Sequence, residues 1–180
     1  KMDFLTLAKT RQSVRGYQTR PVDREDVLKC LEAARLSPSA CNSQPWKMVV
    51  ADEPEQLAKL AEAISPEGKA VNKFVHQVPV LVAVVEEQAV LAPGASSAAD
   101  RWVGIDNGSA ISHFCLEAAE LGLGTCIMGS FDEAQVKDIL KIPAEKTVKI
   151  VIALGYAADE TIRPKLRRPL EQVASFGQYE

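Results

Sequence analysis

The chain has 180 residues, of which 47% are hydrophobic and 25% are charged, the composition of an ordinary globular protein. This excludes a disordered or fibrous chain. Its 21 basic and 24 acidic side chains leave a net charge of −3, which argues against nucleic-acid binding across the whole surface but not against a local basic patch. No signal peptide is evident, and the longest apolar run, residues 78–85, is too short to span a membrane. We therefore expect a cytoplasmic, single-domain protein over residues 1–180.

The hydrophobic residues alternate between helical spacing and short β-branched runs along the chain. We predict helices at residues 3–10, 24–36, 54–64 and 100–121 and after residue 132, and strands at 46–51, 78–85, 125–128 and 147–155. The run at 78–85 is apolar throughout, which predicts a strand buried on both faces. No repeat or low-complexity linker interrupts the pattern, which indicates one α/β domain.

Several predicted helix ends carry residues suited to capping. Asp23 and Asp132 stand at N-cap positions, and Gln135 completes a capping box with Asp132. Gly122 and Gly124 are predicted to stop the helix that begins near residue 100, because glycine tolerates the conformation of a helix C-terminus.

Two segments fit no regular element. Residues 89–99 are rich in alanine, serine and glycine, which predicts a loop. Residues 156–180 carry prolines and a basic run without a clear core-forming pattern, so we expect this tail to embrace a second subunit.

Two basic clusters stand near the ends of the chain. Arg11, Ser13 and Arg15 alternate, so an extended backbone would place them on one face, and Lys165 and Arg167 alternate in the same way. Arginine matches phosphate oxygens bidentately and serine adds a neutral donor. Either cluster alone is more often a solvated surface stretch; together they suggest one phosphate site closed by chain ends that meet in space.

Two further stretches offer ligand-binding groups. The loop at 37–46 carries Asn42 and Gln44, whose amides can both donate to and accept from a heteroaromatic edge, although they could equally cap the preceding helix. Gly129 and Ser130 precede a helix and could lay backbone N–H groups against a ring. The glycines at 122–124 follow a helix and precede a strand, which is the reverse of the dinucleotide-binding arrangement.

Five motifs in order, RQSVRGY, SPSACNSQPWKMVVA, AVNKF, ELGLGTCIMGSFDE and PKLRRPLE, resemble the FMN-dependent nitroreductase family over nearly the whole chain. The resemblance implies an α+β sandwich with a central mixed, largely antiparallel sheet flanked by helices. It also implies a homodimer with two FMN sites at the interface and a domain-swapped C-terminal extension, residues 157–180, that reaches the partner.

The resemblance also implies which residues bind the cofactor. It implies that Arg11 and Ser13 hold the phosphate and that Lys165 and Arg167 close over it. Arg15 would lie near the pyrimidine carbonyl of the flavin and Asn72 at the edge of the ring, and the backbone at Met128, Gly129 and Ser130 would pass the flavin N5 and donate an N–H to it. The partner subunit would contribute Pro38, Ser39, Ala40, Asn42 and Gln44, and Gln12 would also belong to the cofactor-binding residues.

The implied activity is electron transfer from NADH or NADPH through FMN to a nitroaromatic, a quinone or a similar small acceptor, in a ping-pong cycle. Hydride chemistry of this kind needs no protein nucleophile and no metal. Accordingly, no catalytic side-chain set or metal-ligand spacing is readable, and the cysteines lack a CxxC pair. The resemblance leaves no role assigned to Trp102 or Asp106.

Other interpretations remain. A dehalogenase, an enoate reductase or a flavin-destructase-like enzyme would share the fold and cofactor. A flavin-binding module without turnover would share the site. Residues 86–100 offer only a short cover for the flavin, which predicts an open flavin face. A protein without any ligand would leave both basic clusters unexplained.

Overall fold

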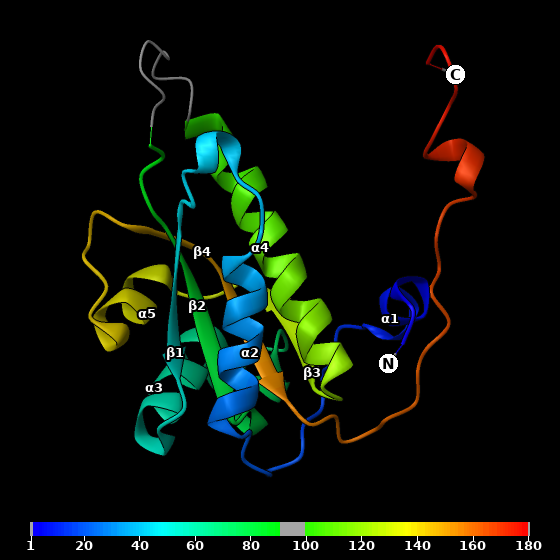
Figure 1. The fold of residues 1–180 in the computed structure, drawn as a ribbon. Helices are drawn as coiled ribbons and strands as arrows, with labels where there is room; N and C mark the ends of the chain where they lie inside the picture. Colours follow the sequence, from blue (N-terminus) through cyan, green and yellow to red (C-terminus); the bar gives the residue numbers. More distant parts are fainter. Residues whose placement is uncertain (1, 91–99, 180) are drawn as a thin grey trace.

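The structure is a computed structural model that describes residues 2–90 and 100–179 (Figure 1). Most of the predicted loop at 89–99 therefore lies outside the described residues. The helices are α1 Phe4–Thr10, α2 Arg24–Arg35, α3 Pro54–Ile64, α4 Asp100–Glu120 and α5 Glu133–Leu140; the strands are β1 Trp46–Ala51, β2 Val80–Glu86, β3 Gly124–Met128 and β4 Thr147–Gly155; the 3₁₀ turns are η1 Ala40–Asn42, η2 Lys73–Gln77 and η4 Leu170–Gln172. The predicted helices and strands are confirmed to within about two residues at each end.

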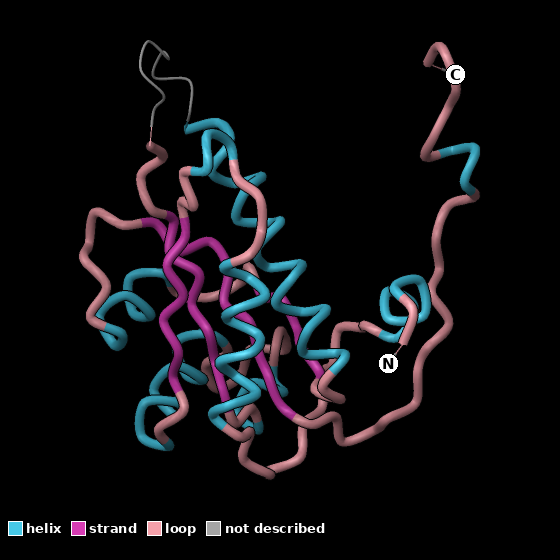
Figure 2. The backbone as a smooth tube through the Cα atoms, in the orientation of Figure 1, coloured by secondary structure: helices cyan, strands magenta, loops and turns pink. Residues whose placement is uncertain are grey.

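The strands form one sheet in the order β1-β2-β4-β3, and every neighbouring pair is antiparallel (Figure 2). The parallel component that the resemblance implied is a single bridge between Ser13 and Thr125 at the β3 edge. The α+β class is confirmed.

Helices cover both faces of this sheet. One apolar cluster joins α2 and α4 to one face, with Phe114 and Ile152 fully buried in it. The other joins α3 and α5 to the opposite face, around Leu60 and Val136. The central strand β2 is buried on both faces, as its uninterrupted apolar sequence predicts.

The C-terminal end of α4 shows two uses of glycine. Gly122 has φ 76°, and Leu123 N–H donates to the Ala118 carbonyl at 2.8 Å, which closes the helix as the glycine predicted. Gly124 was predicted to share this role, which is wrong: it begins β3. Glycine is required at position 124 for a steric reason, since a Cβ there would lie 2.5 Å from Cγ2 of Val14.

Gly124→Ala should therefore push residues 11–15 away from β3. We expect a loss of roughly 1–3 kcal/mol in the free energy of unfolding, measured by urea denaturation, because the added methyl overpacks against Val14. Gly16→Ala is the matched control on the same segment, since its Cβ would meet nothing closer than Ala158 Cβ at 3.9 Å. Equal stability of the two variants would contradict the steric account.

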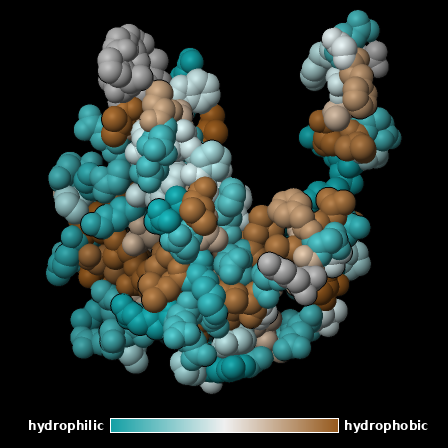
Figure 3. Space-filling view, in the orientation of Figure 1, coloured by the Kyte–Doolittle hydropathy of each residue, from teal (hydrophilic) through white to brown (hydrophobic). Residues whose placement is uncertain are grey.

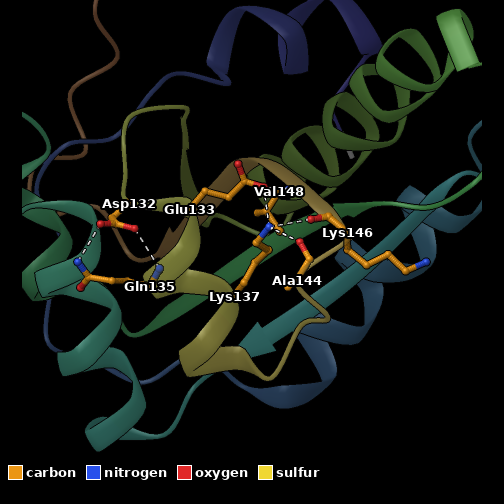
Figure 4. Close-up of polar contacts among 7 residues, drawn as sticks. All are labelled: Asp132, Glu133, Gln135, Lys137, Ala144, Lys146 and Val148. Carbon is orange, nitrogen blue, oxygen red and sulfur yellow. Dashed lines mark hydrogen bonds and ion pairs between the residues drawn. The ribbon is translucent and has the colours of Figure 1, made fainter.

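The two predicted N-caps behave differently. Asp132 accepts from Gln135 N–H at 3.0 Å, as predicted, and the Gln135 amide donates to the other Asp132 oxygen at 2.9 Å (Figure 4). Asp132 N–H bonds the Ala63 carbonyl and not the Gln135 side chain, so the predicted capping box is wrong in its reciprocal bond, and this cap also ties α5 to α3. Asp23 occupies the N-cap position of α2, but its side chain makes no capping bond, so that prediction is wrong in its contact.

A half-buried lysine holds the connection between α5 and β4. Lys137 Nζ donates to the carbonyls of Ala144 and Lys146 at 2.9 and 3.0 Å and lies 3.5 Å from Glu133 (Figure 4). Glu133 in turn accepts from Val148 N–H at 2.9 Å. The charged groups here satisfy backbone atoms that the turn leaves without partners.

Beyond Gly155 the chain leaves the sheet, passes α1 and ends away from the body (Figure 1). The 19.5 kDa chain exposes 11161 Å², against roughly 8,500 Å² for a compact monomer of this mass. Hydrophobic side chains are exposed to solvent on the tail and on α1 (Figure 3). They include Leu166 and Phe176 on the tail and Phe4 on α1. Within residues 2–90 and 100–179, no helix is both long and apolar enough to cross a membrane.

Candidate functional site

The segment after α1 is held against the edge of the sheet. Val14 N–H donates to the Thr125 carbonyl at 2.8 Å, and the Val14 side chain is buried against Gly124. Because side chains alternate along an extended segment, Ser13 and Arg15 lie on the other side from Val14. Arg11 and Ser13 are half-buried there and Arg15 is exposed. The placement agrees with the predicted shared face.

The tail crosses this segment. Lys165 Nζ donates to the Arg11 carbonyl, although the two residues are 154 apart in sequence. Arg163 donates to the Ser13 carbonyl in the same way. The structure therefore brings together the two basic clusters in one chain, as their shared pattern suggested. Arg167 lies near enough for its charge to help lower the pKa of Lys165, after burial and Arg11, and its guanidinium donates to the carbonyl of the neighbouring Leu166 at 2.8 Å.

Gln12 is the anchor of this crossing. Its amide nitrogen donates to the Thr161 carbonyl at 3.0 Å, and its amide oxygen accepts from both N–H and Nε of Arg163, at 3.2 and 3.0 Å. Gln12 was assigned to the cofactor-binding set, but its side chain is engaged with the tail. Arg163 was not assigned at all; its alternation with Lys165 and Arg167 is the signal that could have found it.

Four cations meet at this crossing, and Arg163 adds to the hydrogen bonds from Thr161 that lower the pKa of Asp159. Burial lowers the pKa of Lys165, and the nearby charges of Arg11, Arg167 and Arg163 lower it further. In the described part of the chain, none of these four side chains forms an ion pair. Like charges gathered without an ion-pair partner are destabilising, so the arrangement suits an anion with several acceptor oxygens, such as a phosphate.

A second group of assigned residues gathers at the far end of β3. Asn72 adopts a left-handed conformation with φ 60°, and its amide donates to the Ser130 carbonyl at 3.3 Å. Gly129 and Ser130 are exposed, whereas the Met128 side chain is buried in the core, which leaves only its backbone for a ligand. From Thr125 to Gly129 the strand spans about 13 Å. An extended ligand could therefore reach from the cationic crossing to Asn72.

The remaining assigned residues, Pro38 to Gln44, form a tight loop at η1. Cys41, Asn42 and Gln44 all have positive φ, between 48° and 53°, which is uncommon for residues other than glycine. Ser39 Oγ accepts from Gln44 N–H at 2.9 Å, and the Gln44 amide donates to the carbonyl and side-chain oxygens of Asn42, both at 3.2 Å. Pro38 and Asn42 are exposed.

This loop is not brought to the cationic crossing within one chain. Ala40 is bonded to Asp106 near the start of α4, while Arg11 and Ala119 line one cavity of about 280 Å³ near the end of that helix. The intervening helix from Asp106 to Ala119 is about 20 Å long. Within one chain, the loop and the crossing therefore lie near opposite ends of α4.

Sequence reasoning left Asp106 without a role, and the structure gives it one. Asp106 is 7% exposed, and both its carboxylate oxygens face Ala40 N–H, at 3.2 and 3.1 Å. The neighbouring Asn107 donates to the carbonyls of Pro45 and Val103 at 2.9 and 2.8 Å. The contacts of Asp106 and Asn107 join a helix to a loop that is distant in sequence, and no local sequence motif predicts them.

The described residues contain no group of three His, Cys, Asp or Glu side chains that could hold a metal ion. The cysteines are free thiols, and burial raises the pKa of Cys30 to about 12. An exposed side of α4 carries Trp102, next to Arg101 whose guanidinium lies 4.5 Å from the indole ring.

The protein is of the α+β class, with an antiparallel sheet between two helical layers and a basic tail that passes the β3 edge of the sheet. The chain belongs to the nitroreductase family, whose family model matches residues 8–156. It is 31% identical over 197 residues to an NADH dehydrogenase of Thermus thermophilus, covering 96% of this chain and 95% of that protein.

Solved structures agree with this assignment. A nitroreductase family protein from Clostridium novyi NT superposes with a TM-score of 0.76 at 28% identity, over 91% of this chain and 89% of that one. An FMN-dependent nitroreductase from Clostridium difficile R20291 shares the fold with a TM-score of 0.77 at 24% identity, over 98% of this chain and 100% of that one.

Proposed function

We propose that this protein is an FMN-dependent oxidoreductase that passes electrons from NADH or NADPH to a nitroaromatic, quinone or similar small acceptor. The observation that carries the proposal is the group of cations at the tail crossing, which form no ion pair with any described residue. Burial and the repulsion from Arg11, Arg167 and Arg163 lower the pKa of Lys165 there. Membership of the nitroreductase family and the likeness to an FMN-dependent relative support the same cofactor.

The chain's own residues fit the two ends of FMN. Arg11, Lys165 and Arg167 neutralise the phosphate, and Ser13, fixed by the bridge to β3, adds a donor. At the other end of β3, Asn72 and the exposed backbone at Gly129 meet the polar edge of the ring.

FMN, when bound, supplies the redox chemistry by accepting a hydride and passing its electrons on. The protein contributes binding, orientation and charge. Arg15 adds a positive charge between the phosphate and ring ends, which favours negative charge on the ring. Stacking donor and acceptor in turn over the same ring aligns the reacting atoms, and this alignment supplies much of the rate.

We also propose that the working unit is a homodimer. The loop at Pro38 lies too far from Arg11 of its own chain to share one ligand, whereas a second copy can bring its loop to that ligand. Exposed apolar side chains also support a dimer: Ile105 on α4 is 63% exposed and Phe176 on the tail is 98% exposed. Burying such groups is what stabilises an obligate interface.

The test is an absorbance spectrum of the purified protein, followed by anaerobic addition of NADH and then NADPH. We expect flavin bands that bleach with at least one nucleotide, and parallel double-reciprocal plots with a quinone or nitroaromatic acceptor. Protein that binds no FMN after reconstitution contradicts the proposal. Bound flavin that neither nucleotide reduces would favour a flavin-binding module or a different reductant.

A further inference from the structure

The loop between Ser39 and Pro45 holds a left-handed backbone at three positions, two of which, Cys41 and Gln44, carry residues that rarely adopt it. Cys41, Asn42 and Gln44 are all left-handed, and none of them is glycine. Such conformations persist only where the surrounding contacts over-determine them. Internal bonds of the loop, such as Ser39 Oγ to Gln44 N–H, cannot alone fix its position on the body.

Two consecutive residues of α4 attach the loop at both ends. Asp106 receives Ala40 N–H at the start of the turn, and Asn107 donates to the Pro45 carbonyl at its end. Asn107 also donates to the Val103 carbonyl, which fixes its side chain on the helix. Because α4 is packed against the sheet through Ile111 and Phe114, both attachment points are rigid.

The Asp106 carboxylate depends on this contact. It is almost fully buried, it receives one backbone donor, and it forms no ion pair with any described cation. A buried polar group is unfavourable unless it is hydrogen-bonded, and Ala40 N–H is the donor that bonds this one. What it does here is hold Ala40 N–H inward, while Asn42 stays exposed on the outer side of the turn.

We propose that Asp106 and Asn107 are positioning residues that preform the loop at residues 38–45 for FMN before the cofactor arrives. The inference rests on the proposed function, in which this loop contacts the FMN of the partner subunit. A preformed loop need not be ordered on binding, so the cofactor binds more tightly than it would to a loose loop.

The test compares Asp106→Ala, Asp106→Asn and Lys137→Met with the wild type, all as full-length protein. Asparagine keeps an oxygen that can accept Ala40 N–H, whereas alanine removes it. Lys137→Met is the matched control, because it also removes a charged group that bonds backbone atoms, here on a half-buried side chain on the opposite face of the sheet. Amide hydrogen exchange of Ala40 and Gln44 is measured without FMN, and the FMN dissociation constant by fluorescence titration.

We expect Asp106→Ala to accelerate exchange at Ala40 and Gln44 and to weaken FMN binding by about tenfold. Asp106→Asn should restore both to within about threefold of wild type. Lys137→Met should lower the unfolding temperature without changing either value. Unchanged exchange at Ala40 in Asp106→Ala overturns the inference, and so does normal FMN affinity in that variant. If the wild type binds no FMN, the proposed function fails, and the exchange data still decide whether Asp106 holds the loop.

Discussion

Arg11→Ala and Lys165→Ala should each weaken FMN binding by about ten- to hundredfold, because each removes a charge-assisted bond to the phosphate. The unfolding midpoint of the FMN-free protein should change little in Lys165→Ala. The variant loses the hydrogen bond to the Arg11 carbonyl, but it also relieves the repulsion from Arg11, Arg167 and Arg163 that lowers the Lys165 pKa. The measurements are a fluorescence titration with FMN and a thermal melt of the FMN-free protein.

Arg168→Ala provides the matched control for these variants. Arg168 stands on the same tail but is out of phase with the alternating Arg163, Lys165 and Arg167, and it is exposed. We expect its FMN affinity to stay within about threefold of wild type. Equal losses in Arg168→Ala and Lys165→Ala would mean that general positive charge, rather than a built phosphate site, governs binding.

Truncation after Ala158 should have the larger effect, with loss of the dimer and a fall in FMN affinity of at least about a hundredfold. The truncated chain keeps the bond from Ala158 N–H to the Gly16 carbonyl, so the body retains its last sheet-edge contact. It loses Lys165 and Arg167 together with the exposed apolar side chains of the tail. Sedimentation measures the mass of the assembly, and circular dichroism checks that the body is folded.

A second truncation, after Ala174, separates the two contributions of the tail. It keeps Lys165, Arg167 and Leu170 and removes Phe176 and Tyr179, which are 98% and 100% exposed in the single chain. We expect weaker dimerisation with the phosphate contacts retained. A folded, FMN-bound dimer after truncation at Ala158 would show that the tail neither closes the site nor holds the partner.

Short-range pattern was sufficient for most of the secondary structure. The cap at Asp132 and the stop at Gly122 depend on neighbours within about five residues, which a sequence displays directly. Where the determinant is distant, the same reasoning failed. Glycine often ends helices, so Gly124 is predicted to help stop α4. What requires glycine at this position is instead the close approach of the Val14 side chain, which lies far from it in sequence.

The candidate site divides in the same way. Arg11, Ser13, Lys165 and Arg167 are predicted to bind phosphate from the alternation of basic and hydroxyl side chains, a feature that two short segments carry by themselves. Arg163 continues the alternation of Lys165 and Arg167, so the sequence carries a signal for it as well. The contact of Asp106 leaves no such signal, because its partner Ala40 lies far away in sequence.

By itself, the sequence of this protein determined the order of its helices and strands, the burial of β2 and the two basic clusters, because each depends on local spacing of side chains. The strand order β1-β2-β4-β3, the individual bonds between the tail and residues 11–13 and the attachment of Ala40 to Asp106 are seen only in the tertiary structure. Each of these features is a contact between segments that lie far apart in the sequence. Local spacing of side chains is compatible with several such pairings, and only packing of the whole core favours one of them.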